Sequence, residues 1–416
     1  MAAVFSTVFL VMLAFTTALR AWLALRQMRH VAAHRQAVPT EFADRITLAE
    51  HQKAADYTAA KLRLGMVELA VDAGLLLLFT FGGLLAAFDR FWRGIFPEAD
   101  YTYGLALFAS VGIAGLLVGL PFSLYQTFRL EARFGFNKTT PGTFVGDLFK
   151  QLLLTVLIGA PLLLLVLWLM DAMGEQWWLY VWMTWLGFNL LVLLLYPTFI
   201  APLFNKFTPL PAGETKSRIE ALLARCGFAS SGIFVMDGSK RTAHGNAYFT
   251  GFGRSKRIVF FDTLLDKLAP AEVEAVLAHE LGHFKRRHIW KRVAVMSALS
   301  LALLWLLGLL IDQAWFYEGL KVGAGGTAMA LILFSLVLPV FSFPFGPLMS
   351  WLSRRHEFEA DAYAAQQANG GELIAALVKL YRDNAATLTP DPLHSLFYDS
   401  HPPASQRIAH LRAVTS

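Results

Sequence analysis

Apolar segments that are long enough to cross a lipid bilayer alternate with polar segments along most of the chain. The hydrocarbon core of a bilayer is about 30 Å thick, so a spanning helix needs about 20 predominantly apolar residues. Seven segments meet this requirement: residues 4–25, 66–88, 105–127, 152–170, 179–199, 293–311 and 328–352. The pattern predicts a mainly α fold, a multi-spanning membrane protein with about seven transmembrane helices.

One long stretch, residues 201–292, departs from this pattern and indicates a small water-facing α+β domain. Residues 214–226 have the spacing of an amphipathic helix, and residues 232–236 and 257–261 are rich in β-forming side chains. Residues 246–252, which lie between these two runs, also have extended character.

Polar residues and prolines predict where the membrane helices end. Loops are expected at residues 89–103 and 129–151, which contain most of the charges between their neighbouring spans. Pro121 predicts a bend in the third span, and the prolines at 197, 202, 209 and 211 predict that the chain leaves helical structure after the fifth. Pro339, Pro344 and Pro347 predict an irregular seventh helix.

Composition supports a membrane protein. Only 16% of the residues are charged, whereas about a quarter are charged in an ordinary globular domain. The net charge of +6 does not indicate nucleic-acid binding, because Lys and Arg mark the cytoplasmic loops of membrane proteins. The single cysteine, Cys226, excludes an internal disulfide and a cysteine-based zinc site.

The distribution of Lys and Arg also predicts an orientation. Segments after the first, third, fifth and seventh spans are basic, whereas those after the second, fourth and sixth carry few Lys or Arg. By the positive-inside rule, the N-terminus lies outside and the water-facing domain lies in the cytoplasm. Glu68 and Asp72 lie in the second span, where we expect them to line a polar cavity or to form a structural pair.

The motif His279-Glu280-x-x-His283 is the first candidate for chemistry. Residues four apart lie on one face of a helix, so the two histidines can place their imidazoles on one Zn²⁺. Glu280 adjoins the first ligand and can act as a general base. The helix is expected to open near Pro270, and Gly282 is small where another segment can approach. Such a pentapeptide also arises by chance, so a third ligand must be found.

A second helix, residues 354–361, supplies that ligand. Glu357 and Asp361 lie one turn apart on one face, and we predict Glu357 as the third metal ligand. Asp361 is expected to accept the N–H of a ligating histidine and so to fix its tautomer. Glu359 is expected to point elsewhere, and His356 lies about a quarter turn off that face.

Amide hydrolysis also needs a hydrogen-bond donor for the oxyanion of the intermediate. His401 lies on a loop stiffened by two prolines, and Arg407 lies on the helix that follows. We predict that His401 donates to the intermediate and that Arg407 or a carboxylate fixes its position. His394 and His410 are equally visible in the sequence, so composition alone does not choose among the three histidines.

Asn246, Ala247 and Tyr248 are candidates for binding substrate. Zinc endopeptidases commonly hold substrate as an added strand on an exposed sheet edge. An extended segment about 30 residues before the zinc helix is the natural candidate for that edge. The alternative is an ordinary strand.

The zinc helix, residues 357–361 and residues 400–402 together resemble the type I CaaX prenyl endopeptidases, which are integral-membrane gluzincin proteases. Further segments match the pattern of this family: residues 133–139, 202–210, 237–241, 246–249 and 262–265. The similarity extends from about residue 57 to residue 407.

The resemblance implies a fold and an activity. Seven helices would enclose a water-filled chamber that the zinc domain caps on the cytoplasmic side. One Zn²⁺ would be bound by His279, His283 and Glu357, with Glu280 as the base. His401 and Arg407 would line the site, and the strand at residues 246–248 would hold the substrate backbone. Four regions follow: a five-helix membrane region (1–200), a cytoplasmic catalytic domain (201–292), helices six and seven (293–352) and a C-terminal helical segment that completes the zinc site (353–416).

The family cleaves C-terminally prenylated CaaX proteins, so the implied partners are a peptide or lipidated protein substrate and the lipid bilayer. The loop between the last two spans is short and the final residues show no endoplasmic-reticulum retrieval signal. These features predict a bacterial member in the inner membrane, as opposed to the endoplasmic reticulum of a eukaryote. Because bacteria generally lack prenylated CaaX proteins of their own, the natural substrate stays open, and the sequence does not predict the oligomeric state.

Two alternatives remain at this point. A quality-control protease for damaged membrane proteins would use the same chemistry on other substrates. A transporter or lipid-handling protein would use the chamber itself and hold a structural zinc, with Glu68, Asp72 and Asn189 as its intramembrane polar groups. That alternative predicts four protein ligands in place of three, because a structural zinc site leaves no position open.

Overall fold

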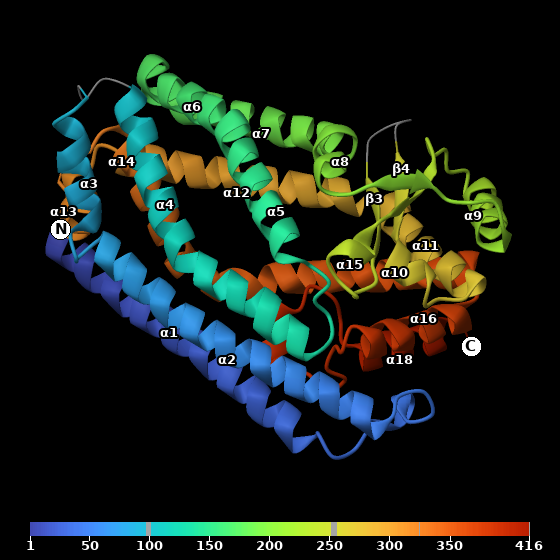
Figure 1. Cartoon of the computed structure of the whole chain (residues 1–416). Coiled ribbons are helices and arrows are strands. Elements are labelled where there is room, and N and C mark those ends of the chain that lie inside the picture. The colour runs from blue at the N-terminus through green and yellow to red at the C-terminus, as the bar shows by residue number, and fades with distance from the viewer. Residues whose placement is uncertain (97–100, 251–255, 324, 416) are drawn as a thin grey trace.

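The computed structural model describes residues 1–96, 101–250, 256–323 and 325–415. Long helices form one end of the molecule, and a small sheet with shorter helices forms the other end (Figure 1). Residues 251–252 of the predicted extended segment and Glu98 and Asp100 of the predicted 89–103 loop lie outside the described residues.

Six helical segments within the described residues are long and apolar enough to span a membrane: Ala2–Ala33, Tyr101–Glu131, Pro141–Ala172, Gly174–Phe204, His288–Leu310 and Thr327–Gln367. A seventh span is present if the pair Leu48–Phe79 (α2) and Leu84–Arg93 (α3), which is bent by 45°, is counted as one. The predicted multi-spanning helical fold is therefore confirmed.

Several predicted loops are helical. Residues 141–151, predicted as part of a loop, belong to α5 (Pro141–Leu154), which Thr140 caps and in which Pro141 takes the first turn. Residues 89–93 belong to α3. The helix α7 (Trp177–Leu195) does not end near Pro197 but continues through a π-helical turn into α8 (Ala201–Phe204). The apolar windows located the spans but not the helix ends, because these helices continue beyond the apolar residues.

The remaining helices of the membrane spans follow the predicted order. Their bounds are α1 (Ala2–Ala33), α4 (Tyr101–Tyr125), α6 (Ala160–Ala172), α12 (His288–Leu310), α14 (Thr327–Ser342) and α15 (Gly346–Gln367), and the short α13 (Ala314–Gly319) lies between α12 and α14. The helix α4 continues through Pro121 and changes to π-helical geometry at Gln126–Glu131. The predicted irregularity near Pro344 is a 3₁₀ turn, Phe343–Phe345, between α14 and α15.

The membrane helices pack closely at the end where α3 and α13 lie and only sparsely elsewhere. Only 6% of the apolar windows of the Tyr101–Glu131 and His288–Leu310 segments is buried within the protein, compared with 39% for Thr327–Gln367. A cavity of about 520 Å³ between α1, α2 and α14 is lined by Asp72 together with Arg20. The predicted cavity-lining position is therefore confirmed for Asp72.

The water-facing domain contains a four-stranded sheet in the order β1-β2-β4-β3. Its strands are β1 (Phe207–Pro209), β2 (Ile233–Met236), β3 (Ala247–Thr250) and β4 (Arg257–Phe261). The strands β2 and β4 are parallel, whereas β1 pairs with β2 and β3 pairs with β4 in antiparallel fashion. The strand β3 is consequently an edge strand of the described sheet.

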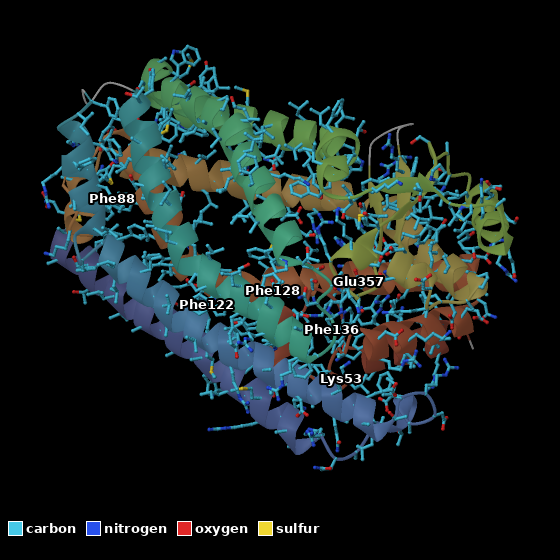
Figure 2. All side chains as sticks on the ribbon, viewed as in Figure 1. Lys53, Phe88, Phe122, Phe128, Phe136 and Glu357 are labelled. Carbon is cyan, nitrogen blue, oxygen red and sulfur yellow. The ribbon has the colours of Figure 1, made fainter. Side chains whose placement is uncertain are left out.

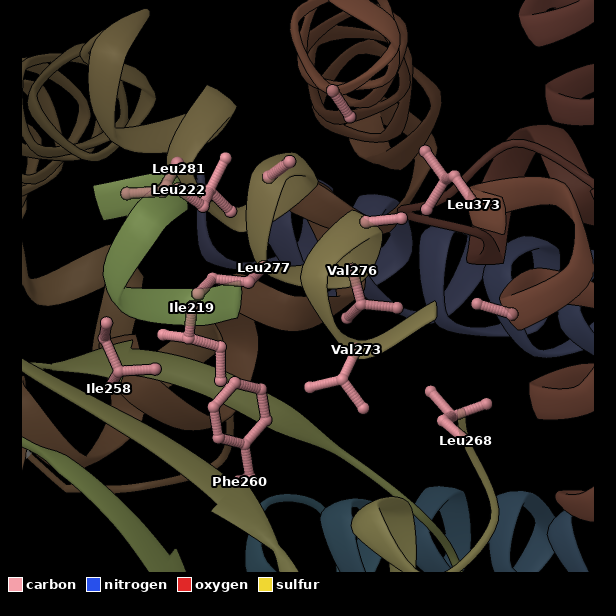
Figure 3. Close-up of a cluster of buried hydrophobic side chains, with 14 of the residues drawn as sticks. Ile219, Leu222, Ile258, Phe260, Leu268, Val273, Val276, Leu277, Leu281 and Leu373 are labelled. Atoms are coloured by element: carbon pink, nitrogen blue, oxygen red, sulfur yellow. The ribbon is translucent and has the colours of Figure 1, made fainter. Parts of the chain in front are cut away.

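Helix α11 (Pro270–Lys285) lies in the core of this domain. Its apolar face packs against α9 (Glu214–Arg225), the strand β4 and α16 (Gly370–Asp383), as Figure 3 shows for Leu277, Phe260 and Leu373. The short α10 (Asp262–Leu265) precedes α11, while α17 (Pro392–Tyr398) and α18 (Ala404–Thr415) complete the C-terminal part. The same core includes Leu411, so the C-terminal segment packs as part of this domain.

Candidate metal centre

Helix α11 begins at Pro270, as the sequence predicts. Pro is suited to the first turn because its missing N–H has no partner there. The Glu272 carboxylate accepts the Ala269 N–H at 2.7 Å and pairs with Lys379 Nζ at 2.7 Å. The start of the helix is fixed in this way, so the register of His279 and His283 on its far turns is fixed too.

Gly282 is the point at which α15 crosses α11. A Cβ atom at this position would lie 2.9 Å from the Cα of Ala360, closer than real Cβ contacts allow. The expected close approach of another segment is therefore present, and the segment is the predicted second helix. The crossing brings Glu357 and Asp361 of α15 against the histidine face of α11.

His279, His283 and Glu357 converge, although they lie on two helices almost 80 residues apart in sequence. The two Nε2 atoms are 3.2 Å apart. Glu357 Oε2 lies 3.4 Å from His279 Nε2, and Glu357 Oε1 lies 3.3 Å from His283 Nε2. Figure 2 labels Glu357 where the helices from the membrane region meet the sheet domain. These are the three residues that the sequence predicted as metal ligands.

The donor set fits a metal ion. The Nδ1 atoms of both histidines face other polar groups, so the two Nε2 lone pairs point at each other and at a carboxylate, an arrangement that repels without a cation. Glu357 Oε2 is buried and receives no hydrogen bond from the described residues. Ligands about 2.0–2.1 Å from a tetrahedral Zn²⁺ are about 3.3 Å from each other, which matches the observed separations.

Asp361 supports the first histidine, as predicted. Its Oδ1 accepts the Nδ1–H of His279 at 2.8 Å. Arg407 Nε and Nη2 donate to the two Asp361 oxygens at 2.8 and 2.5 Å, and Arg407 Nη1 lies 3.7 Å from Glu357 Oε2. Asp361 is fully buried and Arg407 is 6% exposed. Ion pairing with Asp361 outweighs the effect of burial and raises the pKa of Arg407.

The second histidine has a partner that the sequence analysis missed. His283 Nδ1 lies 3.0 Å from Nδ1 of His288, the first residue of α12, and His288 Nε2 lies 3.0 Å from Glu359 Oε2. The expectation that Glu359 simply points away is therefore incomplete, because Glu359 reaches the site through His288. His356 stacks on the His288 ring at 4.1 Å between centroids. His288 lies five residues beyond the motif, and this was the feature of the sequence that could have identified the partner of His283.

A cleft of 330 Å³ opens on the metal-ligand face of α11. Glu280, His401, Arg407, Asn246 and Ala247 line it, so most of the predicted site residues share one cavity. Burial raises the pKa of Glu280, an effect that His279 and His283 partly oppose. A carboxylate with a raised pKa is suited to both accepting and returning a proton.

Tyr248 differs from its neighbours in β3. Its hydroxyl lies 3.8 Å from the sulfur of Met236, and its side chain does not line the cleft. Successive side chains of a strand point to opposite faces, which explains why Ala247 lines the cleft and Tyr248 does not. The backbone of Tyr248 faces Val259 of β4 in the antiparallel register, so Tyr248 offers the free edge of the sheet neither its side chain nor its backbone groups.

The structure separates the three C-terminal histidines that the sequence left equivalent. His401 Nε2 lies 3.4 Å from Glu357 Oε1, and its Nδ1 lies 3.0 Å from Ser400 Oγ. His394 stacks on Tyr398, and His410 lies 3.2 Å from the carbonyl of Phe358. Of the three, His401 is the one beside the metal-ligand cluster.

Residues of α16, together with Asn384 directly after it, form a wall of the cleft that was not predicted from the sequence: Leu373, Leu377, Leu380, Tyr381 and Asn384. The helix is amphipathic, with buried Leu373, Ala376 and Leu377 on one face. That pattern was visible in the sequence but indicates any packed helix, so it could not point to a substrate-facing wall.

The chain is similar to known proteins over nearly its whole length. Residues 27–206 match the family described as CAAX prenyl protease N-terminal, five membrane helices, and residues 209–415 match Peptidase family M48. The Caenorhabditis elegans CAAX prenyl protease 1 homolog is 32% identical over 98% of both chains. The Saccharomyces cerevisiae CAAX prenyl protease 1 is 38% identical over 72% of this chain and 70% of its own.

A solved structure shares the fold. The crystal structure of S. mikatae Ste24p superimposes with a TM-score of 0.91, at 31% sequence identity, and covers 98% of each chain. The resemblance that the sequence analysis drew from separate motifs is confirmed by these matches. With its metal-ligand cluster at the crossing of α11 and α15, the chain belongs to the CAAX prenyl proteases of the M48 peptidase family, a family of membrane metalloproteases.

Proposed function

We propose that this protein is a zinc endopeptidase that cleaves near the C-terminus of prenylated CaaX-type substrates. The single observation that carries the proposal is the convergence of His279, His283 and Glu357, with Glu280 beside them in an open cleft. Three protein ligands leave a position for chemistry, whereas a structural zinc needs four. Membership of a peptidase family also favours this function over a transporter with a structural metal.

The residues around the metal site have separable tasks. When bound, Zn²⁺ lowers the pKa of a water molecule and polarises the scissile carbonyl. The Glu280 carboxylate takes the proton of the attacking water and returns it to the leaving amine. Its raised pKa makes the protonated form accessible for the second step.

His401 is the proposed donor to the oxyanion. Its Nδ1 can accept the Ser400 hydroxyl at 3.0 Å, which leaves the proton on Nε2, the atom that faces the metal-ligand cluster. Arg407 has a different task, because two of its nitrogens are committed to Asp361. We assign Arg407 to holding Asp361 and Glu357 in place and His401 to contacting the reacting group.

The free edge of β3 is the proposed binding surface for the substrate backbone. The Phe261 N–H donates to the Asn246 carbonyl at 3.0 Å, so residue 246 faces β4. Backbone groups of successive residues in an antiparallel strand alternate in direction, which turns Ala247 and Phe249 towards the free edge. A peptide added there would run past Glu280 and could use the leucines of α16 as a side-chain wall.

The low burial of the membrane helices supports a chamber. A solid bundle would bury one face of every helix, yet only 6–11% of the apolar windows of four spanning segments is buried. We propose that these inward faces line the space through which substrate reaches the cleft. We also retain the predicted cytoplasmic position of the cleft and the bacterial inner membrane, on the charge and loop arguments given above.

The test is Glu280→Gln in the full-length protein, assayed by mass spectrometry on farnesylated CaaX peptides and on matched unmodified peptides. Loss of the proton-transfer group should lower the rate by about 10²–10⁴-fold while zinc content stays at one per chain. Full activity in the variant would refute the mechanism. Equal cleavage of farnesylated and unmodified peptides would instead point to the quality-control role.

A further inference from the structure

We propose that His288 positions the second metal ligand, His283. It acts as the middle member of a hydrogen-bonded chain, His283–His288–Glu359. The proposal extends the proposed function, because it concerns how the same metal site is held. Both links of the chain are 3.0 Å long, and His288 is 4% exposed.

Metal binding determines the direction of every hydrogen bond in this chain. The Nε2 atom of His283 faces the ligand cluster, so its remaining proton is on Nδ1. That N–H must donate to His288 Nδ1, which therefore carries no proton. The proton of neutral His288 is then on Nε2 and is donated to the Glu359 carboxylate. Each nitrogen has one role, and reversing either bond would leave two donors or two acceptors facing each other.

The surroundings of His288 hold its ring in this orientation. The His356 ring lies parallel to it at an interplanar angle of 11°. Arg287, immediately before it, adopts a left-handed conformation with φ of 57°, which is unfavourable for a residue with a side chain. This turn between α11 and α12 brings His288 back beneath His283. The Glu359 carboxylate is held in turn by Lys291 at 3.5 Å and Arg355 at 3.4 Å.

The test measures zinc affinity by chelator competition in the full-length purified protein, with the visible spectrum of the Co²⁺-substituted protein as a second readout. His288→Phe keeps the ring volume and the stacking on His356 but removes both nitrogens. Partners of metal-ligating histidines typically contribute about 10–100-fold to metal affinity, and we expect a loss in that range with a changed Co²⁺ spectrum.

Two further variants separate positioning from packing. His288→Asn places an amide oxygen near the position of Nδ1, so it should recover most of the affinity that His288→Phe loses. His356→Phe preserves the stacked ring outside the hydrogen-bond chain and should bind zinc as the wild type does. Wild-type affinity in His288→Phe would overturn the proposal, as would an equal loss in His356→Phe.

If His288→Phe fails to fold, Glu359→Gln tests the same hydrogen-bonded chain at its other end. This variant should fold, because Glu359 is partly exposed and glutamine has the same shape. It should weaken zinc binding measurably while the apoprotein unfolds at an unchanged temperature, and unchanged affinity would contradict the proposal. Metal binding is read without any cleavage assay. A wild-type protein that binds zinc but cleaves no CaaX peptide would therefore refute the proposed function and leave this inference standing.

Discussion

The two histidines proposed as metal ligands lie one helical turn apart, yet the protein supports them in different ways. His279 rests on Asp361, which is fully buried and gripped by two nitrogens of Arg407. His283 rests on His288 and Glu359, and Glu359 is only partly buried, with a side chain 30% exposed. His279 is thus supported by a buried ion pair, Asp361–Arg407, whereas His283 is supported by a hydrogen-bonded chain that ends at the protein surface.

The difference follows from the position of each histidine on α11. The turn that carries His279 is buried beside Arg407 of α18, whose Nη2 lies 3.2 Å from His279 Nδ1. The carboxylate that supports His279 is therefore buried too, and its charge must be neutralised within the core, which Arg407 does. The turn that carries His283 lies at the end of α11, beside the start of α12, where water and surface cations can reach the last carboxylate. The buried support should therefore be the stronger of the two and the less tolerant of change.

The largest effect should come from Asp361→Asn. It removes the charge that Arg407 needs, and breaking a buried ion pair costs about 3–5 kcal/mol of unfolding free energy. Zinc affinity should also fall, by more than in Glu359→Gln, because His279 loses the carboxylate that orients it. Chelator competition and thermal unfolding of the two variants measure the contrast. Equal losses in both variants would mean that burial does not distinguish the supports.

An intermediate effect is expected for Gly282→Ala, which acts on both supports at once. The added methyl would lie 2.9 Å from the Ala360 backbone and would push α15, with Asp361 and Glu359, away from α11. Overpacking of this kind typically costs about 1–3 kcal/mol. Gly187→Ala is the matched control, because that methyl meets nothing within 4 Å. Zinc binding should weaken in the first variant only, and equal behaviour of the two would contradict the close-contact argument.

The smallest effect is expected for Lys291→Gln. Its ammonium lies 3.5 Å from Glu359, but the lysine side chain is half exposed. Exposed ion pairs contribute about 0–1 kcal/mol, so unfolding free energy and zinc affinity should stay close to the wild-type values. If Lys291→Gln lowered zinc affinity as much as Asp361→Asn does, the exposed Lys291–Glu359 pair would contribute as much to metal binding as the buried Asp361–Arg407 pair, which would contradict the comparison.

The sequence predicted the features that depend on local spacing. The apolar windows identified the spans, and the i, i+4 pairs on α11 and α15 identified the four side chains that converge: His279, His283, Glu357 and Asp361. A close approach of another segment at Gly282 was also foreseen, because a glycine within an otherwise regular helix indicates such a contact, although the sequence did not identify Ala360 as the partner. These predictions succeeded because the helical period alone determines which side chains share a face.

The features that were missed depend on tertiary contacts. His288 follows a turn at Arg287 whose left-handed conformation no residue type in the segment signals. The wall formed by α16 depends on how the C-terminal segment folds back, and His401 could be chosen over His394 and His410 only once the loop was in place. The start of α5 was misjudged because polar residues continue a helix outside the bilayer as readily as they end one. The end of the fifth span was misjudged because Pro197 and Pro202 each lie in the first turn of a helical segment, where proline is tolerated.

The Thr327–Gln367 segment, in which the 3₁₀ turn Phe343–Phe345 joins α14 to α15, has a mechanical consequence. At 1.5 Å per residue, its 41 residues have a path length of about 60 Å, and Glu357 lies in the part that follows the turn. A small change in the tilt of α14 within the bilayer would, if α15 followed it, displace the Glu357 carboxylate relative to the imidazoles of His279 and His283. The thickness of the surrounding bilayer would in that case influence the distance between Glu357 and the two histidines.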